Sequence, residues 1–417
     1  MYRLIPLRSM PCLAAFLLGG LPSVCQAAPP ELLRPSGPLS IGRTSYHWVE
    51  PALDQAVGGA TARRELMAHV WYPATPQPSA PRAEYIPDFR AIEAAVGAEN
   101  LKKEAGAFFD ALSSAKTHAV ADAELSPHSS KYPVLLLFHG LRFNALGYSM
   151  LAEDLASHGY VVVGLDLPAI AYAVRFPDQR VTRFTEATWT QPRSPEETQA
   201  FERQVVDRCG QNALFAIDQL ERLESGELPG PFQGRLDLAR LGALGHSFGG
   251  RNAARACQLD KRLKAGALLD SFGRTMTVEK RPDGSSVDQP MMVQYVRRVP
   301  RQGISRIFAL LQTPGKDLEA ELRRARQEFC QSVKAVSYEV TLDTPGIAHE
   351  SFSDILLLET GQSDETRKNR TRAMQLTRDY TRAFFDRHVR DLPAPLLDRA
   401  PADPNEVELI RHTFRDQ

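Results

Sequence analysis

The chain places one serine between glycines in a pattern typical of an activated nucleophile. Residues 245–249 are Gly-His-Ser-Phe-Gly, and the apolar stretch 240–244 leads directly into them. A serine on a sharp turn from strand to helix holds its hydroxyl clear of the sheet. So tight a turn leaves no room for a Cβ two positions to either side, which explains Gly245 and Gly249. The pattern predicts Ser247 as a nucleophile.

A serine hydroxyl attacks a carbonyl only when a neighbouring base takes its proton, and histidine is the usual base. Three histidines follow Ser247 in the chain, namely His349, His388 and His412. His388 falls in a predicted terminal helix and His412 in the C-terminal tail, where we expect both to be solvated. His349 lies in a loop with proline and glycine just after a predicted strand. We therefore predict His349 as the base.

An acid that holds the imidazole in one tautomer completes such a site, and in the order serine, acid, histidine it lies between the other two. Asp270 ends the predicted strand 264–270 and can reach an imidazole from the same sheet edge. Asp343 is the competitor, although it lies so close to His349 in sequence that the two side chains can point apart. Asp166 precedes the serine and is out of order. Asp270 is the predicted acid.

Acyl transfer also needs N–H donors directed at the developing oxyanion. The backbone N–H of Phe248, directly after the nucleophile, supplies one donor. The second is expected from the loop after the predicted strand that ends before His139, and the N–H of Leu141 is the candidate. Chain order leaves His139 and His246 outside the predicted triad, so we expect both to be packing residues. No metal and no organic cofactor is expected.

Strand patterns alternate with helix patterns around these residues. Apolar runs typical of buried strands occupy residues 134–138, 160–166, 240–244, 264–270, 290–294 and 335–341. Ser194 begins a strong helix pattern because a proline and two glutamates follow it. The alternation predicts an α/β fold with a mostly parallel sheet covered by helices on both faces. Reactive side chains gather at the carboxyl ends of the strands in such sheets.

Three further segments depart from that alternation. Residues 65–72 are rich in strand formers and stop at a proline, which predicts an antiparallel edge strand. Residues 85–131 include a helical insertion, and it is either a lid over the site or a peripheral helix pair. Residues 272–335 form a long segment that carries an insertion and is basic in places.

Composition and the first residues limit the remaining possibilities. The chain has 417 residues with 50 basic and 50 acidic side chains, so nothing indicates a nucleic-acid partner. Residues 1–27 combine two arginines, a short apolar run and a small-residue cleavage site at Ala27, which predicts a signal peptide and export. Residues 28–417 are then a single domain. Three cysteines remain there, and we interpret them as core residues that allow one disulfide at most.

Several motifs together resemble one known family. They are Phe138-His-Gly-Leu141, Leu155-Ala-Ser-His-Gly-Tyr160, Gly245-His-Ser-Phe-Gly-Gly250, Leu269-Asp270, His349-Glu-Ser-Phe-Ser-Asp354 and the entry motif Gly37-Pro-Leu-Ser-Ile-Gly42. The chain resembles the platelet-activating-factor acetylhydrolase family of α/β-hydrolases (plasma and type II, with their bacterial relatives) over most of residues 37–390. The resemblance implies the triad and oxyanion donors named above. It also implies calcium-independent hydrolysis of short or oxidised acyl chains from phospholipids and simpler esters.

Two departures from that family bear on the substrate rather than on the predicted triad. Arg142 follows Leu141 where a smaller residue is usual, and the segment between Asp270 and His349 is long. We expect a secreted serine esterase that acts on a small-molecule or lipid ester, with transient contact with a membrane surface left open. The alternatives are a broader lipase or polyester hydrolase of the same fold and a catalytically silent α/β-hydrolase that only binds.

Overall fold

The computed structural model describes residues 31–55, 61–77, 79–168, 170–191, 193–271, 286–297 and 318–413. The predicted signal peptide lies outside the described residues. So do residues 272–285 and 298–317 of the segment that was expected to carry an insertion.

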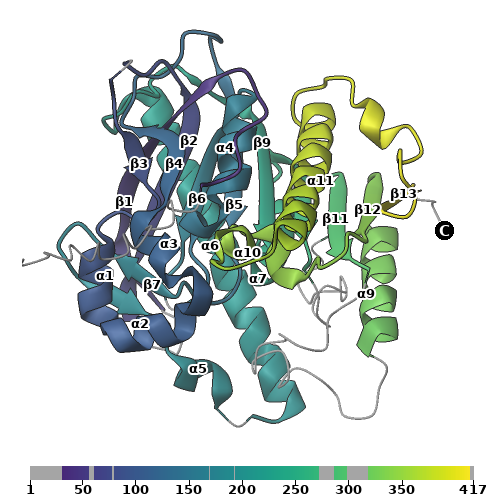
Figure 1. Cartoon of the computed structure of the whole chain (residues 1–417), viewed down its shortest axis with the longest axis horizontal. Helices are drawn as coiled ribbons and strands as arrows, with labels where there is room; N and C mark the ends of the chain where they lie inside the picture. Colours follow the sequence, from purple (N-terminus) through teal and green to yellow (C-terminus); the bar gives the residue numbers. More distant parts are fainter. Residues whose placement is uncertain are drawn as a thin grey trace, which may run out of the picture.

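An eleven-stranded mixed sheet runs through the described part of the chain, in the order β13-β12-β11-β10-β9-β5-β6-β2-β1-β4-β3 (Figure 1). Its central strands are β5 (Tyr132–Phe138), β6 (Val161–Asp166), β9 (Leu236–His246), β10 (Leu263–Leu269), β11 (Met291–Val296) and β12 (Ser337–Leu342). Neighbours within this group of six pair in parallel. This arrangement confirms the predicted α/β architecture, because each central strand corresponds to one of the apolar runs in the sequence.

The central strands are buried on both faces, as their continuous apolar sequences require. In β5 every residue is buried, and successive side chains alternate between two core clusters. Leu136 belongs to the cluster on one face of the sheet, and Leu135 and Leu137 to the cluster on the other. The sheet is therefore the middle layer of three.

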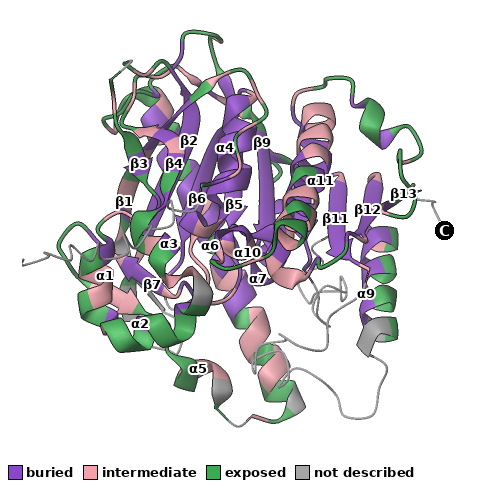
Figure 2. Ribbon diagram, viewed as in Figure 1, coloured by how far each residue is buried: buried purple, intermediate pink, exposed green. Residues whose placement is uncertain are grey.

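Helices cover both faces, and the buried strands lie between them (Figure 2). The helices α6 (Pro195–Ser225), α7 (Phe248–Leu259) and α9 (Leu318–Ser332) contribute side chains to one core cluster. The helices α4 (Ser149–Ser157) and α11 (Asp364–His388) contribute to the other. The predicted apolar face of the terminal helix is confirmed, since Ala373, Leu376, Tyr380 and Phe384 are all buried.

Helix α6 begins where the sequence predicted. The Ser194 side chain accepts the backbone N–H of Glu197, and the Glu197 carboxylate accepts the backbone N–H of Ser194. This reciprocal pair satisfies two donors that a helix N-terminus otherwise leaves free. The helix ends at Gly226, whose φ of 82° is in the left-handed region.

One side of the sheet is antiparallel and differs from the prediction. Strand β2 (Thr61–Ala74) is antiparallel, as expected, but it pairs with β1 (Ser40–Gln55) and with β6, so it is not an edge strand. The edge beyond it is formed by β4 (Lys116–Ala121) and β3 (Arg82–Glu84). Strand β1 was not predicted, because it contains Gly42 and Pro51 and a proline-rich stretch precedes it.

The helical section that the sequence placed before the main sheet is present. It contains α1 (Phe89–Val96), α2 (Ala98–Ala105), η1 (Gly106–Phe108) and α3 (Phe109–Ser114). Helix α1 contacts the small two-stranded sheet of β7 (Ala173–Arg175) and β8 (Val181–Arg183), which is followed by α5 (Glu186–Thr190).

The C-terminal part adds a strand that the sequence analysis missed. After the short elements η4 (His349–Phe352) and α10 (Ile355–Leu358), the chain runs through α11 and η5 (Pro395–Leu397) to β13 (Val407–His412). Strand β13 pairs antiparallel with β12, so β12 is not the last strand and His412 is not in a solvated tail. His388 is also half-buried, because its ring packs against Tyr338 and Phe384. In the described chain, no helix has the length and apolarity that crossing a bilayer requires.

Candidate active site

Ser247 occupies the turn between β9 and α7, with φ 55° and ψ −120°. A non-glycine residue at such an angle is strained, and the strain persists only where the surroundings enforce it. The flanking glycines provide that enforcement. A Cβ on Gly245 would lie 2.1 Å from the Gly249 carbonyl oxygen, and a Cβ on Gly249 would lie 2.1 Å from the Phe138 carbonyl oxygen. The Ser247 N–H donates to the Leu269 carbonyl at 2.8 Å, which ties the turn to β10.

Asp270 and His349 meet at the carboxyl ends of β10 and β12. The distance from His349 Nδ1 to Asp270 Oδ2 is 2.6 Å. Asp270 is only 1% exposed, its N–H donates to the Gln294 carbonyl, and its Oδ1 accepts the Val296 N–H at 3.4 Å. The neighbouring strand β11 therefore fixes Asp270 through both contacts, and the carboxylate in turn orients the imidazole through Nδ1.

His349 also lies beside the residue that precedes the candidate nucleophile. The rings of His246 and His349 have centroids 4.4 Å apart, and His246 Nε2 is 3.0 Å from the His349 carbonyl oxygen. Ser247 and His349 are both partly accessible, at 8% of the residue and 15% of the side chain respectively. The structure thus places Ser247, Asp270 and His349 together at the carboxyl ends of the central strands.

The competing carboxylates have other partners. Asp343 forms an ion pair with Arg297, with 2.8 Å between Oδ2 and Nε. Asp166 accepts the Ala145 N–H at 2.6 Å and lies 3.4 Å from His69 Nε2. Among the described contacts, Asp270 is the carboxylate that meets His349.

The two candidate oxyanion donors flank Ser247. Phe248 is the first residue of α7, so its N–H has no carbonyl from a preceding helical turn to bind. Leu141 follows Gly140, and a Cβ on Gly140 would lie 3.3 Å from the Ser247 Cβ. None of the backbone hydrogen bonds between described residues uses the Leu141 N–H. Phe248 thus adjoins Ser247 in the chain and Leu141 follows a residue packed against it, so both stay candidate donors to an oxyanion.

His246 has a role that the sequence analysis did not find. The Gly140 N–H donates to the Tyr148 hydroxyl at 3.0 Å, and that hydroxyl lies 2.8 Å from His246 Nδ1. Burial lowers the pKa of His246 well below its usual value, and the neighbouring His349 lowers it further. His246 is a buried neutral ring that links the Leu141 loop to the backbone of His349. No sequence signal identified this contact, because it ends on a backbone carbonyl about a hundred residues away.

The loop that carries His349 is anchored to α4 through Asp354. The Asp354 N–H donates to the Gly147 carbonyl at 2.8 Å, and its Oδ1 accepts the Met150 N–H at 3.1 Å. Tyr85 donates to Oδ2 at 3.2 Å. Burial raises the pKa of Asp354 well above its usual value. The carboxyl group caps the first turn of α4 and holds the His349 loop against it.

His139, the other histidine predicted to serve packing, is buried and bonded on both ring nitrogens. Its Nδ1 is 2.8 Å from the Gly140 carbonyl oxygen, and its Nε2 accepts the Leu167 N–H at 3.2 Å. Burial lowers its pKa. This ring braces the loop before Leu141 against the end of β6.

Comparisons with known proteins identify the family. Residues 30–361 match the family of platelet-activating factor acetylhydrolase, isoform II. The chain belongs to this family. The prediction from the sequence motifs is confirmed in that respect.

Relatives within and near the family include two vertebrate proteins and one fungal protein. Platelet-activating factor acetylhydrolase of Gallus gallus is 26% identical over 196 residues, which cover 42% of this chain and 46% of the relative. The enzyme of that name from Cavia porcellus is 29% identical over 154 residues, or 34% and 35% of the two chains. A probable 1-alkyl-2-acetylglycerophosphocholine esterase of Arthroderma benhamiae is 25% identical over 247 residues, or 57% and 58%. The chain thus spans about half the length of the curated relatives it matches.

A solved structure extends the similarity to nearly the whole chain. The ferulic acid esterase from Streptomyces cinnamoneus superposes with a TM-score of 0.68 at 26% identity, covering 92% of this chain and 100% of that one. Together with family membership, this similarity confirms the α/β-hydrolase fold that the sequence predicted. The named relatives and this neighbour are esterases, which favours ester hydrolysis as the chemistry of the family site.

The surroundings of the site include the helical section and α5. Glu104 of α2 forms an ion pair with Arg142, the residue after Leu141. The Arg142 guanidinium lies over the Phe184 ring, 5.6 Å from its centroid. Trp189 of α5 meets the Phe248 ring edge-on at 5.6 Å. The region of residues 85–131 therefore contacts the loop that carries one candidate oxyanion donor.

Proposed function

We propose that this protein is a serine carboxylic ester hydrolase. The observation that carries the proposal is the 2.6 Å contact between His349 and Asp270, at the sheet edge where Ser247 is held in a strained turn. Membership of the acetylhydrolase family and the ferulic acid esterase neighbour support the same chemistry.

The proposed reaction uses an acyl-enzyme. Ser247 Oγ attacks the ester carbonyl while His349 Nε2 takes its proton, and the N–H groups of Leu141 and Phe248 stabilise the oxyanion. His349 then gives the proton to the leaving alcohol as the tetrahedral intermediate collapses. A water molecule repeats the sequence on the acyl-enzyme and releases the acid. Asp270 keeps the proton of the neutral imidazole on Nδ1 throughout, so that Nε2 is free to accept. No step calls for a metal or an organic cofactor.

For the substrate, we propose short acyl esters, including phospholipids with a short second chain. The relatives named as platelet-activating factor acetylhydrolases support this choice. A broader esterase is the second candidate, and the aromatic side chains of Phe184 and Trp189 beside the site favour it, together with the ferulic acid esterase neighbour. Turnover across acyl chain lengths, with a feruloyl ester and a phospholipid bearing a short second chain, separates the two.

For localisation, we propose export of the chain after cleavage near Ala27. The support is the charged start, the short apolar run and the small-residue site of residues 1–27. Determining the first residue of the secreted protein by mass spectrometry tests this proposal.

Replacement of the nucleophile tests the central proposal. We expect Ser247→Ala to lower kcat on p-nitrophenyl acetate by roughly 10⁴- to 10⁶-fold, with an unchanged circular dichroism spectrum. Ser113→Ala is the matched control, because Ser113 is an exposed serine of α3. An organophosphate should label wild type and Ser113→Ala but not Ser247→Ala. A near-normal rate in Ser247→Ala would refute Ser247 as the nucleophile, whereas wild type without turnover or label would favour a chain that only binds.

A further inference from the structure

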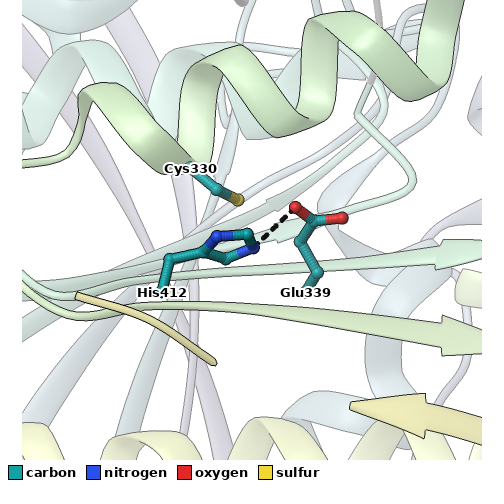
Figure 3. Close-up of side chains that lie close together, drawn as sticks. All are labelled: Cys330, Glu339 and His412. Carbon is teal, nitrogen blue, oxygen red and sulfur yellow. Dashed lines mark ion pairs between the residues drawn. The ribbon is translucent and has the colours of Figure 1, made fainter. Parts of the chain in front are cut away.

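A cysteine, a glutamate and a histidine meet near the end of the sheet that carries β13. Cys330 comes from α9, Glu339 from β12 and His412 from β13 (Figure 3). One ligand atom of each lies within 4.8 Å of the other two. These residues belong to neither the candidate active site nor its hydrogen-bond partners.

The pairing of β12 with β13 explains why these side chains lie close together. His412 is directly opposite Ser337 in the antiparallel register, so it shares a face of the sheet with Ser337 and with Glu339 two residues further on. Helix α9 covers that face. The Ser337 hydroxyl donates to the Cys330 carbonyl at 2.8 Å, which fixes the last turn of α9 over the strand.

Two polar atoms of the cluster, Glu339 Oε1 and His412 Nε2, form no hydrogen bond with the described protein groups. Glu339 is 2% exposed, and its Oε1 lies 2.8 Å from His412 Nε2. Neither atom has a hydrogen-bond partner among the described residues, so the contact lacks the geometry of an N–H···O bond. The ion pair drawn in Figure 3 requires a protonated His412, and a buried carboxylate oxygen that accepts no hydrogen bond calls for an explanation.

A bound cation explains the arrangement. Sulfur, imidazole nitrogen and one carboxylate oxygen are a ligand set suited to Zn²⁺, whereas Ca²⁺ and Mg²⁺ require oxygen ligands. Tyr295 donates to the other carboxylate oxygen, Oε2, at 3.3 Å and so leaves Oε1 free to bind a metal. Outer hydrogen bonds of this kind orient metal ligands. Ligand atoms around tetrahedral zinc lie roughly 3.3–3.7 Å apart, so the imidazole and carboxylate need to separate by about half an ångström.

The charges also balance. A thiolate and a carboxylate neutralise Zn²⁺, and the imidazole binds as the neutral ring. One fixed positive charge is close, since the Arg326 guanidinium lies 3.7 Å from the centroid of the Tyr295 ring. The Arg326 guanidinium interacts with the negative charges of Asp270 and Glu339, which offset its positive charge.

We propose that Cys330, Glu339 and His412 bind one Zn²⁺ ion, with a water molecule as the fourth ligand. Binding replaces the thiol proton with a sulfur–zinc bond and releases that proton to solvent. The ion joins a helix and two strands, including β13, which pairs with β12 alone at the end of the sheet. The ion therefore ties the edge strand β13 to β12 and α9.

Metal analysis of the full chain tests the proposal. The protein is dialysed against zinc buffered at micromolar free concentration and analysed by inductively coupled plasma mass spectrometry. We expect about one zinc per chain in wild type, and a lower zinc content in Cys330→Ser, Glu339→Gln and His412→Ala because each loses about tenfold or more in affinity. His128→Ala is the matched control, because His128 is exposed and outside the cluster. The zinc contents of His128→Ala and wild type should agree.

A second measurement identifies the ligands without relying on activity. Cobalt(II) added to metal-free wild type should give a thiolate-to-cobalt absorption band that Cys330→Ser lacks and Cys209→Ser keeps, since Cys209 is also buried but lies elsewhere. Zinc should raise the Tm of wild type but not of His412→Ala. Wild type without bound zinc, or with the same zinc content as the three variants, would overturn the proposal.

Discussion

His246 joins two parts of the proposed catalytic centre through one ring. The hydrogen bonds around it define its tautomer, since the Tyr148 hydroxyl accepts the Gly140 N–H and must use its own proton to bind Nδ1. The proton of the neutral ring is then on Nε2, which donates to the His349 carbonyl. His246 is a positioning residue that acts through the proposed base and through the loop before Leu141.

Replacement of His246 with asparagine separates positioning from stability. The shorter asparagine side chain keeps an acceptor near the place of Nδ1 but cannot reach the His349 carbonyl. We therefore expect kcat on p-nitrophenyl acetate to fall by about 10- to 100-fold with little change in KM. His246→Gln, which extends a donor toward that carbonyl, should restore part of the rate. The two variants should have similar Tm values. Rates within about twofold of wild type in His246→Asn would contradict the role.

The order of residues along the chain selected the candidate triad but not the residues that support it. Ser247, Asp270 and His349 were selected by chain order and by their places at strand ends, and the structure brings them to one edge. His246 and Tyr148 were not selected, because their partners are a backbone carbonyl and a backbone N–H. Contacts of that kind depend on the three-dimensional path of the chain and leave no pattern in it.

Helix α2 reaches the proposed oxyanion loop from outside the main sheet. Its Glu104 pairs with Arg142, whose φ of 65° places it on a tight turn directly after Leu141. We propose that the helical section of residues 85–131 shapes the acyl-binding side of the site. A single exposed ion pair contributes little free energy, so a charge reversal is a stronger test than a neutral replacement.

Glu104→Lys sets two positive charges against each other and should move α2 away from the loop. We expect the ratio of p-nitrophenyl decanoate to p-nitrophenyl acetate turnover to change by about threefold or more. Glu99→Lys makes the same charge change at an exposed position of the same helix and should leave the ratio as in wild type. If both variants keep the wild-type ratio, the helical section is scaffold only.

Strands were predictable from the sequence where all or nearly all of their residues are buried. The strands β5, β6 and β10 are buried throughout or nearly so, and their continuous apolar sequences predicted them within a few residues. The outer strands β1, β3, β4 and β13 were not predicted, because each is partly exposed and no continuous apolar run marks it. In β13 only Val407 is buried, and a strand of that composition is indistinguishable from a polar tail without its partner β12.

At the scale of the whole molecule, buried ionisable groups couple folding to pH. Burial lowers the pKa of His139, His246 and His388, so the folded protein binds fewer protons at these sites than the unfolded chain. Their contribution to stability therefore falls as the pH drops below about 6.5. Glu153 and Asp354 act in the opposite direction, since burial raises their pKa values. The dependence of the free energy of unfolding on pH combines both effects. The difference in that free energy between wild type and a variant isolates the contribution of one group.

His388 is the best residue for this comparison, because it is the last residue of α11 and takes no part in the proposed reaction. Burial, followed by the charges of Arg387 and Arg411, lowers its pKa to about 4. Between pH 6.5 and 4 the unfolded chain takes up a proton at this site and the folded protein does not. The free energy of unfolding of wild type should therefore fall, relative to His388→Gln, by up to about 1.4 kcal/mol per pH unit of acidification.

Urea unfolding of both proteins at several pH values between 4 and 8 measures this difference. Above about pH 7 the two curves should run parallel, because His388 is neutral in both the folded and the unfolded state of wild type. Loss of the hydrogen bond between His388 and the Tyr338 hydroxyl offsets the curves by a constant and does not change their slopes. Parallel curves for His388→Gln below pH 6.5 would mean that His388 titrates as freely in the folded protein as in the unfolded chain.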